Sequence, residues 1–199
     1  MVIYFLSLGS NEGDRQAYLK EAISRLGGDT GGGAEVLAVA SLYETSPVGY
    51  TNQANFLNTA VAVRSSTDPP SMLALCKKIE QDMGRHTPFR WGPREIDLDL
   101  VWWGEGSWDD ESRWIERKWK SPELVIPHPR TTERLFVLIP LAEIAPGLPI
   151  HGKPVESWIV RLKQPREQVN HLLPVSAQSA EQLVRKIAAA PQWHAGVPM

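Results

Sequence analysis

The sequence predicts an α+β fold in which two helices cover one face of an antiparallel sheet. Four segments show the apolar or alternating pattern of strands, and two segments repeat apolar residues at helical spacing. Their order along the chain is β-α-β-β-α-β. Because this is the order of the split βαβ arrangement, four antiparallel strands with both helices on one face are expected.

The first half of that pattern starts at the N-terminus. Residues 2–8 form an apolar run that predicts a strand, and Asp14 is placed to cap a helix after a glycine-containing turn. The apolar positions of this helix recur at helical spacing, at Leu19, Ala22, Ile23 and Leu26. Residues 35–43, rich in valine, leucine and alanine, predict the second strand.

The second half repeats the pattern in the order strand, helix, strand. Residues 56–64 alternate as a third strand, and Asp68 followed by two prolines marks the start of a helix that ends at Gly84. The apolar stripe of this helix is Met72, Leu75, Ile79 and Met83. Residues 96–103 form the fourth strand, which completes the ferredoxin-like order.

The rest of the chain shows weaker signals. Residues 104–121 form a charged, tryptophan-rich insertion for which a short helix at 110–119 is expected. A short strand at 124–126, a helix capped by Thr131 or Thr132, and helices near 156–162 and 180–190 follow as C-terminal additions. The domain boundaries are expected to be 1–165 for the main domain and 166–199 for a C-terminal extension.

Composition limits the class of protein. A length of 199 residues suits one domain, and a formal net charge of −2 gives no sign of a nucleic-acid partner. The single cysteine, Cys76, excludes an internal disulfide framework and fits a reducing cytoplasm. No apolar run reaches the length of a membrane span, and the N-terminal run has no basic segment of a signal peptide. A cytoplasmic monomer with small-molecule partners is expected.

The strongest chemical signal lies at the start of the fourth strand. Ile96, Leu98 and Leu100 alternate with Asp97 and Asp99. Residues two apart on a strand share a face at roughly 6.6 Å, so both carboxylates can bind one hard cation or two. Just upstream, Arg94 follows a Gly-Pro turn and can fork onto a phosphate. For an acid pair considered alone, a strand whose polar face happens to be acidic is the commoner explanation.

Two further groups of residues suggest a binding site. Phe56 and Asn58 share a face of the third strand, and an aromatic ring beside an amide can recognise a flat heterocycle. His128 lies between two prolines, and Arg134 and Phe136 follow it near a helix start. Together with Arg94 and the acid pair, these residues indicate a polyphosphate site.

At this point the chain resembles a known family. The runs SLGSNEGD, TSPVG, FLNTAV, IEQDMGR, WGPREIDLDL and IPHPRTTERLFVLIPLAEIAP occur in the order and spacing of 6-hydroxymethyl-7,8-dihydropterin pyrophosphokinase, over residues 3–147. The resemblance implies an ATP-dependent transferase of folate biosynthesis. Such an enzyme moves the pyrophosphoryl group of ATP onto the hydroxymethyl oxygen of the pterin and releases AMP, with attack at the β-phosphorus and two Mg²⁺ ions as cofactors.

The resemblance also implies roles for individual residues. By position, Asp97 and Asp99 resemble the metal ligands, and they form the catalytic set together with Arg85 and Arg94. The residues that fall where the family contacts ATP are Glu80, Arg85, Trp91, Arg94, Leu100, His128 and Arg134. Those that resemble the pterin site are Thr45, Val48, Phe56, Asn58 and Phe136.

The chain departs from the family pattern in three places, and two other functions stay open. Lys77 stands where some members have a neutral amide, the loop 85–91 is about one residue shorter than in some relatives, and the insertion 104–121 is longer than usual. One alternative is another metal-dependent nucleotidyl- or glycosyltransferase that uses the same acid pair. The other is a non-enzymatic ferredoxin-like domain that binds RNA or senses a ligand.

Overall fold

The structure, a computed structural model, describes residues 1–28, 34–86, 91–108, 110–162 and 173–174. In chain order the elements are β1 (Val2–Ser10), α1 (Arg15–Gly27), β2 (Glu35–Val39), β3 (Tyr43–Thr45), β4 (Phe56–Ser65), α2 (Pro69–Asp82), β5 (Asp97–Ser107), β6 (Asp110–Glu116), β7 (Trp119–Lys120), β8 (Val125–Ile126), a 3-10 turn η1 (Thr131–Glu133), α3 (Leu135–Ile144), β9 (Pro149–Ile150), β10 (Lys153–Pro154), α4 (Val155–Leu162) and β11 (Leu173–Pro174).

The main sheet is antiparallel throughout and has β1 near its middle. Its strand order is β11-β3-β4-β1-β5-β6, and β2 also pairs with β4. β1 pairs along its whole length with β4, and on its other side it pairs with β5. The sequence therefore correctly predicted a mixed α/β chain with an antiparallel sheet.

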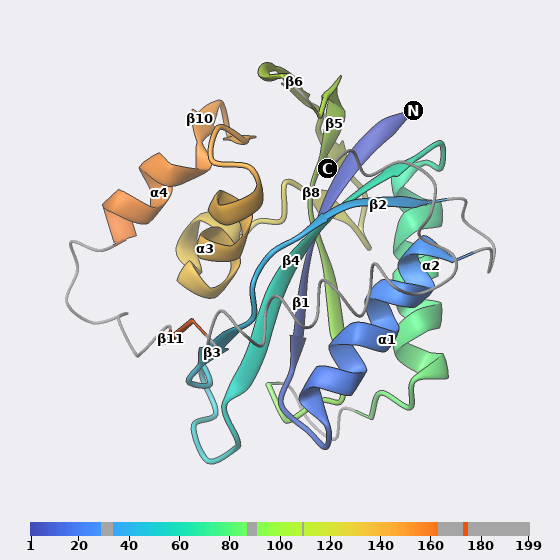
Figure 1. Cartoon of the computed structure of the whole chain (residues 1–199), viewed down its shortest axis with the longest axis vertical. Coiled ribbons are helices and arrows are strands. Elements are labelled where there is room, and N and C mark those ends of the chain that lie inside the picture. The colour runs from blue at the N-terminus through green and yellow to red at the C-terminus, as the bar shows by residue number, and fades with distance from the viewer. Residues whose placement is uncertain (29–33, 87–90, 109, 163–172, 175–199) are drawn as a thin grey trace.

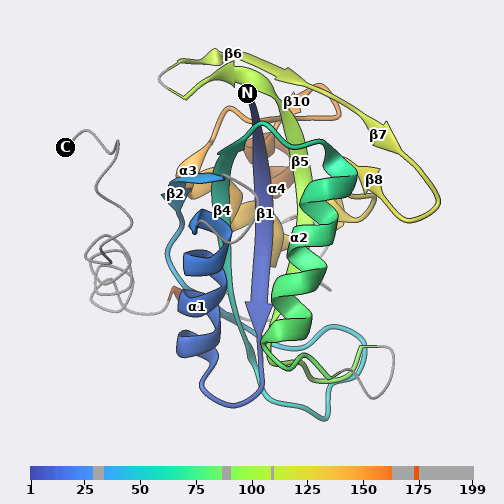
Figure 2. The same ribbon diagram turned by 90° about the vertical axis from the view of Figure 1, so that its right-hand side faces the viewer.

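Both faces of the sheet are covered by helices. Figures 1 and 2 show α1 and α2 on one face and α3 and α4 on the other. Side chains of β1 alternate between the two cores: Tyr4, Leu6 and Leu8 face the first pair of helices, whereas Ile3 and Phe5 face the second pair. This strand is buried on both faces, which explains why it reads as a continuous apolar run.

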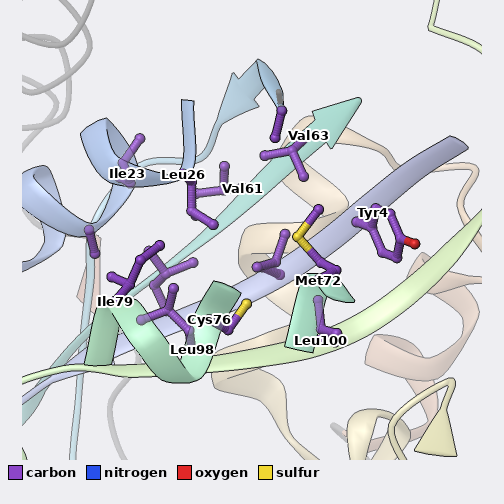
Figure 3. Packing of buried hydrophobic residues seen from close by; sticks show 14 of the residues in the cluster. Tyr4, Ile23, Leu26, Val61, Val63, Met72, Cys76, Ile79, Leu98 and Leu100 are labelled. Atoms are coloured by element: carbon purple, nitrogen blue, oxygen red, sulfur yellow. The ribbon is translucent and has the colours of Figure 1, made fainter. Parts of the chain in front are cut away.

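The core beneath α1 and α2 follows the predicted stripes closely. Leu19, Ala22, Ile23 and Leu26 are buried on α1. Figure 3 shows Ile23 and Leu26 of this helix, with residues of α2, packed against the strands. Both predicted caps are present, because Asp14 accepts a hydrogen bond from the Ala17 amide at 3.0 Å and Asp68 accepts one from the Ser71 amide at 2.9 Å. On α2 the stripe includes Cys76, while Leu75 is only partly buried.

The predicted second strand is divided in the structure. The expected strand at 35–43 is two strands, β2 and β3, separated at residues 40–42. At the break, the Ser41 amide donates to the carboxylate of Glu143 on α3 instead of to a neighbouring strand. The apolar pattern across the break could not reveal this, because Ala40 and Leu42 are buried although they lie outside the strands.

The helix expected at 110–119 was wrong: this segment forms β6 and β7. β6 pairs with the end of β5, and the backbone of the two strands is so close at Gly104 that a Cβ there would lie 2.2 Å from the Ile115 carbonyl oxygen. Trp114 turns into the core, where its ring lies 5.3 Å from that of Phe5 and 6.2 Å from that of Trp102. The insertion therefore extends the main sheet by the strand β6, and Trp114 of this strand is buried in the core.

The C-terminal half also differs in one helix start. The helix expected to be capped by Thr131 or Thr132 begins two or three residues later as α3, after the η1 turn, and no side chain caps it. α4 agrees with the helix expected near 156–162. The helix expected at 180–190 lies outside the described residues. Among the described residues, no helix combines the length and the apolar character that a membrane crossing needs.

Candidate active site

A cavity of about 330 Å³ opens where β1, β3, β4 and β5 meet the loops that connect them. It is large enough for small-molecule ligands. Its wall contains five basic side chains against two carboxylates, which is an excess of three positive charges. The lining residues are Ser7, Gly9, Thr45, Ser46, Val48, Gly49, Gln53, Phe56, Asn58, Lys77, Arg85, Trp91, Arg94, Asp97, Asp99, His128, Arg130, Arg134 and Phe136.

The acid pair lies on the strand β5 and faces this cavity. Asp97 is paired with Gly9 and Asp99 with Ser7 of β1, and all four residues line the cavity. Leu98, between the two acids, is buried in the opposite core. The prediction that both carboxylates point the same way is confirmed, because the strand alternates between the core and the cavity.

Arginines surround the acid pair. Arg85 and Arg94 approach the two oxygens of Asp97 at 2.7 Å and 2.6 Å. Arg134 lies 3.7 Å from a carboxylate oxygen of Asp99, and its guanidinium also lies 5.5 Å from the centre of the Phe136 ring. Each of the three side chains is about one-fifth exposed, so they are partly desolvated while still facing the cavity.

The pKa values of Asp99 and His128 are shifted. Burial, and then the negative charge of Asp97, raise the pKa of Asp99 to about 6. Its side chain keeps 37% of its surface because it faces the cavity, but the surrounding protein still disfavours its charged form. Burial, and then the positive charges of Arg134 and Arg130, lower the pKa of His128 below its usual range. The imidazole is therefore neutral near pH 7, with Nδ1 accepting a hydrogen bond from the Arg130 amide at 3.2 Å.

Aromatic and amide side chains also line the cavity, and the part of the wall that they form is called its aromatic end. Phe56 and Asn58 come from β4, and Phe136 comes from the first turn of α3. The side-chain amide of Asn58 donates to the hydroxyl oxygen of Thr45 at 2.7 Å, which fixes its orientation. Gly9 lies so close that a Cβ there would be 2.8 Å from the Asn58 amide oxygen. Glycine at this position thus leaves the space that the amide occupies.

Two loops meet over the cavity. The ring of Trp91 packs on Gly49, where a Cβ would lie 2.7 Å from ring atom Cε3. Gln53 joins the same two loops, since its amide donates to the carbonyls of Tyr50 at 2.6 Å and Trp91 at 2.9 Å. Asn11, at the end of β1, donates to the side-chain oxygen of Gln53 at 2.9 Å. The loop between β3 and β4 is therefore connected to the loop before β5.

Asn11 also fixes the backbone of Arg94. The side-chain oxygen of Asn11 accepts a hydrogen bond from the backbone amide of Arg94 at 2.9 Å. The backbone amide of Asn11 donates one to the Arg94 carbonyl at 3.1 Å. Only 3% of Asn11 is exposed, so these hydrogen bonds are shielded from water. Sequence reasoning missed Asn11 and Gln53, because polar residues in a turn and a connector look like ordinary loop residues.

The structure brings together all but two of the predicted site residues. Those that line the cavity are Thr45, Val48, Phe56, Asn58, Arg85, Trp91, Arg94, Asp97, Asp99, His128, Arg134 and Phe136. Glu80 and Leu100 are buried beside the cavity and are absent from its lining. The Glu80 carboxylate accepts from the Leu98 amide at 2.7 Å and also pairs with Lys77 and Arg85. It therefore supports the strand between the two acids.

The acid pair provides few ligands of its own for a metal. Within the described part of the chain, no group of three or more acidic, histidine or cysteine side chains could hold a metal ion. Two adjacent carboxylates facing a cavity nevertheless suit Mg²⁺, which is commonly held by one or two carboxylates together with waters and substrate phosphates. Burial, and then the charge of Asp97, raise the pKa of Asp99, and a cation between the two acids would relieve the second of these effects.

Comparison with known proteins identifies close relatives. A family described as 7,8-dihydro-6-hydroxymethylpterin-pyrophosphokinase matches residues 5–146. A 2-amino-4-hydroxy-6-hydroxymethyldihydropteridine pyrophosphokinase of Bacillus subtilis is 44% identical over 142 residues, which are 71% of this chain and 77% of the relative. The protein of that name from Methylorubrum extorquens is 40% identical over 158 residues, 79% of this chain and 92% of the relative.

Solved structures agree on the fold. One described as HPPK-DHPS in complex with substrates superimposes with a TM-score of 0.58 at 15% identity, over 80% of this chain. A Plasmodium falciparum HPPK-DHPS triple mutant with SDX-DHP gives a TM-score of 0.59 at 18% identity, over 86% of this chain. This chain spans 43% and 46% of those two longer chains.

Proposed function

Because the chain belongs to the 7,8-dihydro-6-hydroxymethylpterin-pyrophosphokinase family, we propose that it transfers the pyrophosphoryl group of ATP to 6-hydroxymethyl-7,8-dihydropterin. The products would be the pterin diphosphate and AMP, a step of folate biosynthesis. The observation that carries this proposal is that one cavity is lined both by an acid pair with surrounding arginines and by two phenylalanines with an amide. The comparisons favour neither another transferase nor a non-enzymatic binding domain.

The aromatic end suits the pterin. Phe56 and Phe136 would stack on the two faces of the flat heterocycle. The amide of Asn58 would bond to the edge of the ring, with Thr45 holding that amide in place through the 2.7 Å hydrogen bond. Val48, in the loop that follows β3, would contact the same ligand through its backbone.

The part of the wall that carries the charged side chains, its charged end, suits the triphosphate of ATP. Arg85, Arg94 and Arg134 offer planar groups of donors that match phosphate oxygens. His128 is neutral and can donate from Nε2, because its Nδ1 already accepts a hydrogen bond. Trp91 would cover this end of the cavity. We assign Glu80 and Leu100 to the support of the nucleotide site, since both are buried beside it.

Asp97 and Asp99 would hold two Mg²⁺ ions. Bound there, the metal would neutralise phosphate charge and lower the pKa of the substrate hydroxyl. The chain itself would then contribute position and charge. Arg85 and Arg94 would stabilise the negative charge that spreads over the phosphate oxygens, and the two stacked rings would align the hydroxymethyl group with the β-phosphorus.

The proposed chemistry is an in-line displacement. The hydroxymethyl oxygen forms a bond to the β-phosphorus, and the bond between that phosphorus and the oxygen bridging to the α-phosphorus breaks. AMP leaves with the bridging oxygen, and the proton of the hydroxyl is released to solvent. Because phosphoryl transfer needs little covalent help, orientation and charge neutralisation can supply most of the catalysis.

The test is product analysis. Purified protein with Mg²⁺, ATP and the dihydropterin should yield AMP and pterin diphosphate in equal amounts. Phosphorus NMR would identify and quantify the two products. Omission of the pterin should stop AMP release. Formation of ADP would show an ordinary kinase, and free pyrophosphate with a nucleotide-pterin adduct would show a nucleotidyltransferase. Either result would overturn the proposal.

We also propose a fold classification, domain boundaries and a cellular location for this protein. The strand order β5-β1-β4-β2, with α1 and α2 on one face, supports the ferredoxin-like classification. Residues 1–165 would form the pyrophosphokinase domain, with the insertion at 104–121 and an extension at 166–199. A single, buried cysteine fits a reducing cytoplasm, where the protein would act as a monomer.

A further inference from the structure

The last turn of α3 carries a carboxylate with unusually many hydrogen bonds for an exposed side chain. Glu143 accepts from the Ser41 amide at 2.9 Å and 3.1 Å, one distance for each oxygen. It also accepts from the Ser41 hydroxyl at 2.7 Å and from the Tyr43 hydroxyl at 2.7 Å. All the donors belong to the segment between β2 and the start of β3.

The two elements joined by this carboxylate both contribute residues to the aromatic end of the cavity. α3 carries Phe136 in its first turn. β3 begins at Tyr43 and ends at Thr45, and these residues are paired with Asn58 and Phe56 of β4. A shift of α3 along the sheet would therefore move one ring relative to the other ring and its neighbouring amide.

Apolar packing alone controls this position poorly. α3 rests on the sheet through Val137, Leu138 and Leu141, and the facing core includes Ala60 and Ala62 of β4. The hydrophobic effect is non-directional, so burial favours contact between the layers without itself selecting one position along the sheet. Hydrogen bonds depend on both distance and angle, so they can fix the position along the sheet.

We propose that Glu143 is a positioning residue for the pterin, which sets the gap between Phe136 and the wall formed by Thr45, Phe56 and Asn58. The inference rests on the pterin site proposed above. A carboxylate suits this role because it only accepts hydrogen bonds, and every group that faces it here is a donor. Glutamine would turn one of its two oxygens into an NH₂ group facing a donor.

The hydroxyl of Tyr43 is one of the hydrogen-bond donors to Glu143. Burial, followed by its hydrogen bond to Glu143, raises the pKa of its hydroxyl, so Tyr43 stays a donor at all physiological pH values. Replacement of Tyr43 by phenylalanine removes one hydrogen bond and keeps the ring. This change tests the connection with little risk to folding.

The experiment is calorimetry of pterin binding. The ligand is 6-hydroxymethylpterin, titrated into protein saturated with Mg²⁺ and α,β-methylene-ATP, which cannot transfer its pyrophosphoryl group. Glu143→Gln and Tyr43→Phe should each raise the Kd of the pterin about 3- to 10-fold, while the Kd of the ATP analogue changes less than about twofold. An unchanged pterin Kd in both variants, or equal loss for both ligands, would overturn the inference.

Two further variants separate the possible causes. Glu116 accepts from the His151 amide at 2.7 Å and joins β6 to the chain after β9, away from the cavity lining. Glu116→Gln should leave the pterin Kd unchanged, and a loss equal to that of Glu143→Gln would show a general effect of stability. Phe136→Ala tests the pocket itself: if it leaves pterin binding intact, the proposed site fails, whereas loss there without loss in Glu143→Gln refutes only the positioning role.

Discussion

At the scale of single residues, the site depends on two carboxylates that share one face of a strand. Asp97 is held by two arginines, whereas Asp99 has a longer contact, at 3.7 Å, to Arg134. The difference explains why the pKa of Asp99 is raised by burial and by its neighbour, with only partial compensation from a basic side chain. A cation would relieve the repulsion between the two acids.

Replacement of either acid by its amide should therefore abolish most activity without loss of the fold. Asp97→Asn and Asp99→Asn keep the shape of the side chain but remove the charge, and we expect kcat to fall by at least about 100-fold. AMP release at saturating Mg²⁺ and thermal unfolding would be measured on the same samples. Asp82→Asn, which affects an exposed acid paired with Lys78 on α2, provides the matched control. Near-normal turnover in both site variants would refute a metal-binding role.

His128 should make stability depend on pH. Because its pKa in the folded protein is lowered, the unfolded chain takes up a proton first as the pH falls below about 6.5. Stability is thus unaffected well above that pH and is lost as the pH falls towards the folded pKa. Urea unfolding at pH 7.5 and 5.5 should show a smaller loss for His128→Gln than for the unchanged protein. An equal loss in both proteins would contradict this explanation.

Single residues also mark the limit of what sequence reasoning could find here. Asp97, Asp99 and Arg94 were predictable, because a period of two and a Gly-Pro turn determine their direction locally. Asn11 and Gln53 were not predictable, because their importance comes from partners far away in the sequence. No local pattern records such contacts.

At the scale of elements, the two loops over the cavity depend on a glycine. Gly49 has φ +91°, a conformation that other residues adopt only with strain, and the ring of Trp91 occupies the space where its side chain would lie. Trp91 itself has φ +65°. A larger residue at position 49 would thus disturb both loops at once.

Gly49→Ala should weaken ligand binding beyond its effect on stability. The backbone strain should cost about 1–2 kcal/mol, and displacement of Trp91 should raise KM for ATP several-fold. Gly152→Ala is the matched control, since Gly152 also has a positive φ of +71° but has no atom within 4 Å of an added Cβ. It should lose similar stability and keep its KM. Equal KM values for the two variants would show that the loop contact is unimportant.

The elements that were predicted correctly are those whose signals are local. Caps at Asp14 and Asp68 and regular apolar spacing locate α1 and α2 within a residue or two. β6 was mistaken for a helix because tryptophans among charged residues follow no clear period. Its strand conformation comes from pairing with β5 and from burial of Trp114, which are tertiary effects.

At the scale of the whole molecule, one sheet separates two hydrophobic cores, and the cavity is lined from both sides, by Lys77 of α2 and by Phe136 of α3. The second core, beside α3 and α4, extends from the cavity to the hairpin of β5 and β6. Trp114 closes the far end of this core with 7% of its surface exposed. Substitutions at the Trp114 end of this core should therefore change the stability of the fold without changing catalysis at the cavity.

Trp114→Ala should destabilise the fold by about 3–5 kcal/mol, because it removes a large buried ring from contact with Phe5 and Trp102. Below its lowered melting temperature, the variant should keep kcat within about twofold. Ile115→Ala is the control in the same strand, since Ile115 is 61% exposed and should have little effect. Loss of kcat in folded Trp114→Ala would mean that the hairpin influences the site.

The two guanidinium groups around Asp97 should affect the order in which the metal ion and the nucleotide bind. A lone divalent cation must compete with Arg85 and Arg94 for this carboxylate. Arg94 would then lose its carboxylate partner, whereas Arg85 would keep its ion pair with Glu80. If phosphate arrives together with the cation, each arginine exchanges one anionic partner for another and no charge is left unbalanced. The site should accordingly bind free Mg²⁺ weakly and bind the metal–nucleotide complex as a single unit. This selectivity would come from Asp97, Arg85 and Arg94.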